Sequence, residues 1–90
     1  MTKNEVKELA SCEVYQDLKD GRHDTICVCG GPNGLNKAMY IAKMLAEKDK
    51  DGSPYYVIPI EDKDVFIPGG GWQYTFKKDK DGVVRMSSME

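Results

Sequence analysis

The sequence predicts one α+β domain, a two-layer sandwich of helix, strand and helix followed by three or four mostly antiparallel strands. Two patterns support this fold class. The segment Thr25–Cys29 has a composition that suits a buried strand and precedes a glycine-rich turn and an amphipathic run that ends near Lys48. Apolar and polar residues alternate from Trp72 to Lys77, ahead of a turn sequence. We expect the helices to cover one face of the sheet.

The first twenty residues favour a helix. Thr2 and Glu5 fit a capping box, and Gly21 suits a helix C-terminus. A hairpin that turns at Asp20 and Gly21 is the competing interpretation, so residues 13–23 stay open between helix and hairpin. The helical interpretation depends on apolar residues at a drifting spacing: Val6, Leu9, Ala10, Val14 and Leu18.

The glycine-rich turn joins the predicted strand to the helix that follows it. Pro32 ends the strand, and Asn33 or Gly34 can cap the helix. The glycines match neither a P-loop nor a dinucleotide fingerprint, so a tight connection is the simpler interpretation. Contact with a phosphate, of a nucleic acid or of a nucleotide, is the alternative. That contact would involve Gly31, Asn33, Gly34 and Asn36.

The helix after the turn carries an apolar stripe. Its members recur at helical spacing and are Leu35, Ala38, Met39, Ile41, Ala42, Leu45 and Ala46.

The second half of the chain predicts strands. Tyr55–Ile60 has a strand composition, with Pro59 near its end. Tyr55 and Tyr56 point to opposite faces, so the solvent-side tyrosine is a candidate anchor for a protein or a base. The other predicted elements are a turn over 61–63, a short strand over 64–67, a glycine loop over 68–71, a strand over 72–77, a hairpin turn over 79–82 and a last strand over 83–89.

Composition limits the classes of function. The 90 residues suit one domain, and the net charge of -2 shows no overall basic excess. The basic part is the segment 21–45, which has three basic residues against one acidic residue. The polar N-terminus and the lack of a long apolar run predict neither a signal peptide nor a membrane span. Three cysteines, an odd number, suit a reduced compartment, so we expect a cytoplasmic protein with no membrane partner.

No residue pattern predicts catalysis. Cys12, His23, Cys27 and Cys29 make a conceivable zinc set, but Cys27 and Cys29 are separated by one residue, closer than zinc ligands usually are. We interpret the cysteines as small buried hydrophobes, and His23 with Asp24 as a surface pair. We therefore expect no enzyme activity, no catalytic residue, no metal and no cofactor.

Aromatic residues on the strand over 72–77 form the best functional cluster. Trp72, Tyr74 and Phe76 share one face and could stack on bases, with Lys77 and Lys78 just beyond them. The alternative is that this face packs on the core.

Several stretches together resemble the Alba superfamily, and within it the stage V sporulation protein S family. They are Gly31–Ala38, above all Leu35-Asn36-Lys37-Ala38, the helix 39–46, Ile58-Pro59, and the closing hairpin up to Glu90. The resemblance spans roughly residues 24–90. Family members begin with a strand ahead of the first helix, which this chain is expected to lack, and their loop is one residue shorter than Gly30–Gly34.

The resemblance implies a small, often dimeric α/β sandwich that binds DNA or RNA. It implies that Lys37 and Lys43, with Arg22 nearby, contact the backbone, while a hairpin arm embraces the nucleic acid. The acids Asp79 and Asp81 interrupt that arm. The basic residues of the arm are Lys77, Lys78, Lys80 and Arg85.

Two functions follow. The first is an Alba-like, non-enzymatic nucleic-acid-binding or regulatory protein. The second is a protein-binding adaptor or inhibitor, of a type that phages and mobile elements encode. One continuous positive face would favour the first, and a dominant acidic face the second. A homodimer stays open in either case. The second function would use the aromatic strand and an acidic rim formed by Asp49, Asp51, Glu61, Asp62 and Asp64.

Overall fold

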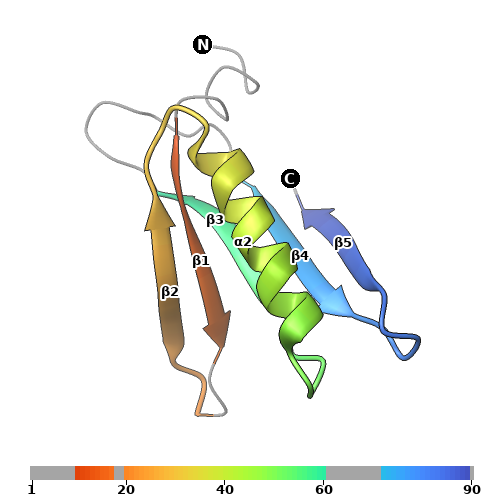
Figure 1. Cartoon of the computed structure of the whole chain (residues 1–90). Helices are drawn as coiled ribbons and strands as arrows, with labels where there is room; N and C mark the ends of the chain where they lie inside the picture. Colours follow the sequence, from red (N-terminus) through yellow and green to blue (C-terminus); the bar gives the residue numbers. More distant parts are fainter. Residues whose placement is uncertain (1–9, 18–19, 61–71, 90) are drawn as a thin grey trace.

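The computed structural model describes residues 10–17, 20–60 and 72–89, in which five strands form one antiparallel sheet and one helix lies across it (Figure 1). The sheet order is β2-β1-β3-β4-β5. The elements are β1 (Ser11–Asp17), β2 (His23–Cys29), α2 (Gly34–Lys48), β3 (Tyr55–Ile60), β4 (Gln73–Lys78) and β5 (Val84–Met89).

The expected first helix is wrong where the structure describes it, because residues 11–17 form β1. Cys12 and Val14 are fully buried, whereas Glu13 and Tyr15 between them are only partly buried. This period of two belongs to a strand with one covered face. β1 pairs with β2 on one side and β3 on the other, so these pairings outweigh the weak helical spacing. The rest of the expected helix, before Ala10, lies outside the described residues.

The correction changes the fold class. The described chain is strand, strand, helix and three further strands, in place of helix, strand and helix followed by strands. The hairpin alternative is the one confirmed: β1 and β2 are antiparallel, and Gly21 has a φ of 83° in the turn between them. Among the described residues, β1 and β2 both precede α2, so the expectation that this helix has no pair of strands ahead of it is also wrong.

The other expected elements are confirmed where the structure describes them, with one difference in burial. The strand over Thr25–Cys29 was expected to be buried, but β2 is an edge strand in which five of the seven residues are exposed. β3 spans Tyr55–Ile60 as predicted. β4 and β5 pair around a turn that is closed by two backbone hydrogen bonds, one donated by the Asp79 N–H to Val83 and one accepted by the Asp79 carbonyl from Gly82. Asn33 occupies the N-cap position of α2 with a φ of 67°, without a side-chain capping bond. The elements expected over 61–71 lie outside the described residues.

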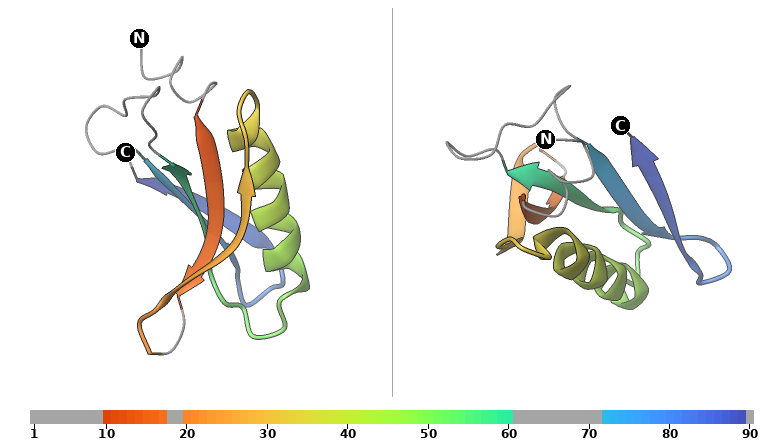
Figure 2. Two further views of the ribbon diagram at one scale, coloured as in Figure 1. Left: turned by 90° about the vertical axis from the view of Figure 1, so that its left-hand side faces the viewer. Right: turned by 90° about the horizontal axis from the view of Figure 1, so that it is seen from above.

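The core lies between α2 and one face of the sheet, as the two views in Figure 2 show. Ala38, Ala42 and Ala46 are fully buried, so the helix approaches the strands closely. The larger apolar residues of the predicted stripe are partly buried around this alanine line: Leu35, Met39, Ile41 and Leu45. From the sheet, Val14 and Val57 complete the centre of the core. α2 therefore covers one face of the sheet and leaves the opposite face without a described helix.

Two buried titratable groups belong to this core. Burial, with Cys29 as a second cause, raises the pKa of the Cys12 thiol from 9.0 to about 11. The Tyr55 hydroxyl donates a 2.7 Å hydrogen bond to Asp49 Oδ2. Burial first, and then Asp49, raise the pKa of Tyr55 from 10.0 to about 12. Both groups are therefore neutral in the folded protein at neutral pH.

We predict that the free energy of unfolding is steady from pH 7 to pH 9 and falls between pH 9 and pH 12. Both folded pKa values exceed the unfolded ones, so the unfolded chain loses its protons first as the pH rises. Urea unfolding at several pH values measures this. Tyr55→Phe should reduce the decline above pH 10, to which Tyr15 also contributes because its pKa is raised. Tyr40→Phe, at an exposed position, should leave the decline unchanged. A decline unchanged in Tyr55→Phe would contradict this account.

Candidate nucleic-acid interface

The sheet face opposite α2 carries a row of side chains from neighbouring strands. Tyr15 pairs with Tyr56, Tyr56 with Thr75, and Thr75 with Ser87. Directly paired residues of antiparallel strands point to the same face, so these four side chains cross the sheet together. Cys12 and Val14 on β1 point to the α2 side, which places Tyr15 on the other side. We call this surface the helix-free face, because no helix among residues 10–17, 20–60 and 72–89 covers it.

Three aromatic rings stack at one side of this row. The Tyr15 ring centroid lies 3.9 Å from that of His23 and 5.0 Å from that of Tyr56, with interplanar angles of 19° and 23°. Because β2 and β3 flank β1, the Tyr15 ring lies between the other two. Tyr56 and His23 therefore form the two ends of the stack.

Glu13 fixes the β2 end of the stack. Its Oε2 accepts a 2.7 Å hydrogen bond from Thr25 Oγ1 and lies 3.3 Å from His23 Nε2. Partial burial, followed by the negative charge of Asp17 and other neighbours, raises the pKa of Tyr15. The Tyr15 hydroxyl is therefore a neutral hydrogen-bonding group at physiological pH.

Two positively charged side chains lie next to the row of Tyr15, Tyr56, Thr75 and Ser87, on the side of the β4–β5 turn. Lys77 and Arg85 are paired residues on β4 and β5, two positions from Thr75 and Ser87, so they lie on the helix-free face. The Arg85 Nε donates a 3.0 Å hydrogen bond to Asp79 Oδ2, yet 73% of the Arg85 side chain is exposed. The same face thus combines tyrosine rings with two exposed positive charges.

Asp79 is held by the turn as well as by Arg85. Its Oδ1 accepts hydrogen bonds from the backbone N–H groups of Asp81 and Val83, at 2.9 and 3.0 Å. The Val83 N–H, and then the Arg85 side chain, lower the pKa of the Asp79 carboxyl. Asp79 therefore supports the hairpin that carries Arg85.

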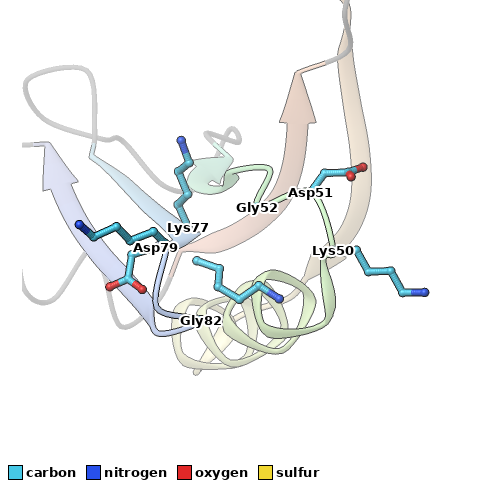
Figure 3. Close-up of a pocket in the computed structure, with 8 residues that line it drawn as sticks. Lys50, Asp51, Gly52, Lys77, Asp79 and Gly82 are labelled. Atoms are coloured by element: carbon cyan, nitrogen blue, oxygen red, sulfur yellow. The ribbon is translucent and has the colours of Figure 1, made fainter.

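A hollow of about 400 Å³ lies between the α2–β3 turn and the β4–β5 turn (Figure 3). Lys50 and Asp51 point away from the β4–β5 turn in this view. The Lys78 Nζ donates a 3.0 Å hydrogen bond to the Glu47 carbonyl, which ties β4 to the end of α2. The charges around the hollow therefore do not converge on one point. Its lining residues are Lys50, Asp51, Gly52, Lys77, Lys78, Asp79, Lys80 and Gly82.

The sequence-predicted cations divide between the two faces of the molecule. Lys37 and Lys43 are exposed on α2, on the other side of the sheet from Lys77 and Arg85. Tyr40, which sequence reasoning did not single out, is 65% exposed between the two lysines of α2. The continuous positive face over the loop, helix and hairpin is therefore not formed.

The glycine-rich loop is also remote from the hairpin, since the two lie at opposite ends of α2 (Figure 1). Of its predicted phosphate-contacting residues, Gly34 is buried. Gly31 donates from its backbone to Ser11 Oγ at 3.4 Å. The other three predicted phosphate-contacting residues, Gly31, Asn33 and Asn36, are exposed.

The predicted aromatic strand faces the core. Trp72 and Phe76 are each 4% exposed, and Tyr74 is partly buried on the same side. Their shared face is confirmed, and it is the face that packs under α2. Trp72 thus has almost no exposed ring surface for a base.

Sequence reasoning missed Tyr15 because it favoured a helix for the surrounding segment. It expected His23 to pair with Asp24, whereas His23 Nε2 lies 3.3 Å from Glu13 Oε2 and the ring stacks on Tyr15. The alternation of Cys12 and Val14 with Glu13 and Tyr15 was the signal that could have placed Tyr15 on an open face. The prediction that Tyr55 and Tyr56 point to opposite faces is confirmed: Tyr55 is 9% exposed, and Tyr56 lies on the helix-free face.

The conceivable zinc set is divided by the sheet. Cys27 and Cys29 pair with Val14 and Cys12 on the α2 side, whereas His23 stacks on Tyr15 on the helix-free face. Among residues 10–17, 20–60 and 72–89, no three His, Cys, Asp or Glu side chains are grouped to hold a metal ion. The three cysteines form no disulfide. The interpretation of them as small buried residues is confirmed for Cys12 and Cys29, whereas Cys27 is only partly buried.

No family model, curated protein or solved structure matches the chain. The Alba resemblance is therefore untested and stays a prediction. In the described part of the chain, no helix combines the length and the apolar character needed to cross a bilayer.

Proposed function

We propose that the protein binds single-stranded DNA or RNA on its helix-free face. The observation that supports this is the position of Tyr15 and Tyr56 beside the cross-strand pair Lys77 and Arg85. Stacking platforms for single strands combine aromatic rings with positive side chains along the backbone path. The binding surface of this proposal is thus formed by Tyr15, Tyr56, Lys77 and Arg85, with His23 at the far end of the stack.

Each group has a definite part in the proposal. His23 and Tyr56 cover the two ring faces of Tyr15, so an incoming base stacks at Tyr56, the β3 end of the stack. Lys77 and Arg85 contact phosphates, which fix the strand in place without reading its sequence. The function is non-enzymatic, and its compartment is the cytoplasm, where the three free cysteines stay reduced.

The number of cations sets the expected salt dependence. Each phosphate neutralised on a single strand contributes a slope of about -0.7 to the logarithm of affinity against the logarithm of salt. Two contacts, from Lys77 and Arg85, therefore give a slope of about -1.4. A clamp that used all six predicted cations would give about -4.

Matched charge removal on the two faces tests the proposal. Lys77→Gln/Arg85→Gln should abolish most of the salt slope for a labelled single-stranded oligonucleotide, while Lys37→Gln/Lys43→Gln should retain it. Fluorescence anisotropy from low salt to ~200 mM measures both variants. If the α2 variant loses binding and the sheet variant does not, the interface is the loop and helix. If the wild-type chain fails to bind at low salt, the proposal is wrong.

A tyrosine pair tests the stacking step. Tyr56→Ala should weaken binding by about 1–3 kcal/mol, the usual contribution of one stacked base. Tyr40→Ala, which removes the same side chain from the surface of α2, should leave affinity unchanged. Equal losses in both variants would argue against a platform at Tyr56.

A protein partner is the second candidate, and exposed apolar side chains at the two sheet edges favour it. Val28 is 60% exposed on β2 and Met89 is 67% exposed on β5. The acidic rim gives less support: Asp49 accepts hydrogen bonds within its own turn, and Glu61, Asp62 and Asp64 lie outside the described residues. Purification from the native host with no stoichiometric partner would count against this candidate.

A further inference from the structure

β5 forms an open edge of the sheet. Among the described strands only β4 pairs with it, so the outer side of β5 presents backbone N–H and C=O groups without a strand partner. Five of its six residues are exposed, including Met86 at 52% and Met89 at 67%. A sheet edge of this kind is a template for another strand.

The two edges of the sheet differ in how they are protected. β2 contains a bulge, because Val14 pairs with Cys27 and Tyr15 with Thr25, which leaves Ile26 as an extra residue. Bulges twist an edge and discourage pairing. β5 keeps a regular register with β4 over all six residues and has no proline. Its single charge is Arg85, so β5 is the edge suited to strand addition.

The hydrogen-bond pattern identifies the outward-facing groups of β5. The Asp79 N–H donates to the Val83 carbonyl at 2.9 Å, so this pair bonds toward β4. Hydrogen-bonded and non-hydrogen-bonded pairs alternate along an antiparallel ladder. The N–H and C=O groups of Val84, Met86 and Ser88 therefore point away from β4, toward the open edge.

We propose that β5 pairs antiparallel with β5 of a second copy of this chain, about a two-fold axis at Met86. This register places Met86 opposite Met86 and Val84 opposite Ser88. The outward N–H and C=O groups of each strand therefore face the outward C=O and N–H groups of the other strand. The pairing forms about six hydrogen bonds across the axis. It needs no change in the β4–β5 ladder.

The side chains match in the same register. Met89 lies opposite Val83, which is 48% exposed, so both exposed apolar residues at the ends of the edge are covered. Arg85 lies opposite Ser87, and no like charges oppose each other. The interface is isologous, as two-fold dimers require. The sheet continues through the dimer, with both copies of α2 on one side and both helix-free faces on the other.

Cysteine cross-linking tests the register. Met86→Cys should give a disulfide-linked dimer on mild oxidation, because hydrogen-bonded partners have Cα atoms about 5.5 Å apart, within disulfide range. Ser88→Cys, opposite Val84, should not link to itself. The wild-type chain is the negative control, because its three cysteines lie on β1 and β2, away from the proposed β5 interface. A dimer that links through Ser87→Cys instead would overturn the Met86 register.

Proline substitution tests the edge without oxidation. Met86→Pro removes an outward N–H and keeps the β4 ladder, so sedimentation equilibrium should show the dimer weakened at least tenfold. Met86→Lys, which opposes two positive charges at the axis, should act likewise. Both variants should keep the wild-type circular dichroism. A wild-type chain that stays monomeric at several hundred micromolar overturns the proposal, as does a dimer that both substitutions leave intact. These experiments measure only the association of two copies of the chain. A negative result would therefore leave the nucleic-acid proposal standing.

Discussion

Gly34→Ala should destabilise the protein by about 3 kcal/mol or more. A Cβ at this position would lie 2.5 Å from the Cys29 carbonyl oxygen and 3.2 Å from that of Ala10. Both neighbours are backbone atoms at the ends of strands, so relief would require α2 to move away from the sheet. The loss is large for a domain whose total stability is about 5–15 kcal/mol. Urea unfolding followed by tryptophan fluorescence measures it.

Gly30→Ala is the matched control in the same turn. A Cβ at Gly30 would meet no atom within 4 Å. We expect its effect to stay within about 0.5 kcal/mol. Equal stability of Gly34→Ala and Gly30→Ala would show that the helix does not approach β1 and β2 as closely as described.

Trp72→Ala should destabilise the fold by about 3–5 kcal/mol, because it removes a large side chain that is 4% exposed and leaves a cavity under α2. The variant separates the two interpretations of the aromatic strand. A core residue affects unfolding, whereas a base-stacking residue on the surface affects binding. Chemical denaturation followed by circular dichroism gives the unfolding free energy without relying on the tryptophan signal.

Two further variants control this experiment. Trp72→Phe keeps an aromatic ring and should recover much of the loss. Tyr40→Ala, at a residue that is 65% exposed, should change stability by less than about 0.5 kcal/mol. A Trp72→Ala protein with normal stability and lost oligonucleotide binding would reverse our placement of Trp72.

Sequence patterns predicted correctly those secondary-structure elements that are determined by residues close together in the chain. The strand, turn and helix up to Lys48 combine a strand composition, glycines and a helical stripe, and all three are present. The hairpin turn at Asp79–Gly82 follows from its residues, with Gly82 at a φ of 82°. These features depend on short-range sterics and hydrogen bonds, which are determined by the residue types within the same stretch.

β1 could not be settled in the same way. Its residues allow both a helical spacing and an alternation, and the choice depends on β2 and β3, which pair with it from elsewhere in the chain. Strand preference depends on such neighbours more than helix preference does. A central strand is therefore the element that single-sequence reasoning is most prone to misassign.

The candidate site shows the same division. The pairing of Lys77 with Arg85 follows from the predicted hairpin. The contact of Tyr15 with Tyr56 required the β1–β3 pairing, which no local pattern indicates. The side of the sheet that α2 covers was also undetermined, and it decides that Trp72 lies in the core while Tyr56 lies on the helix-free face.

The most direct test of the proposed function is an amide chemical-shift map of the labelled protein during titration with a short single-stranded oligonucleotide at low salt. We predict that the largest shifts occur at Tyr15, Tyr56, Lys77 and Arg85, on strands that adjoin one another on the helix-free face. Residues on the α2 surface, such as Lys37 and Lys43, should shift little. Shifts confined to α2 and the glycine-rich loop, or no shifts at all, would contradict a nucleic-acid interface on the helix-free face.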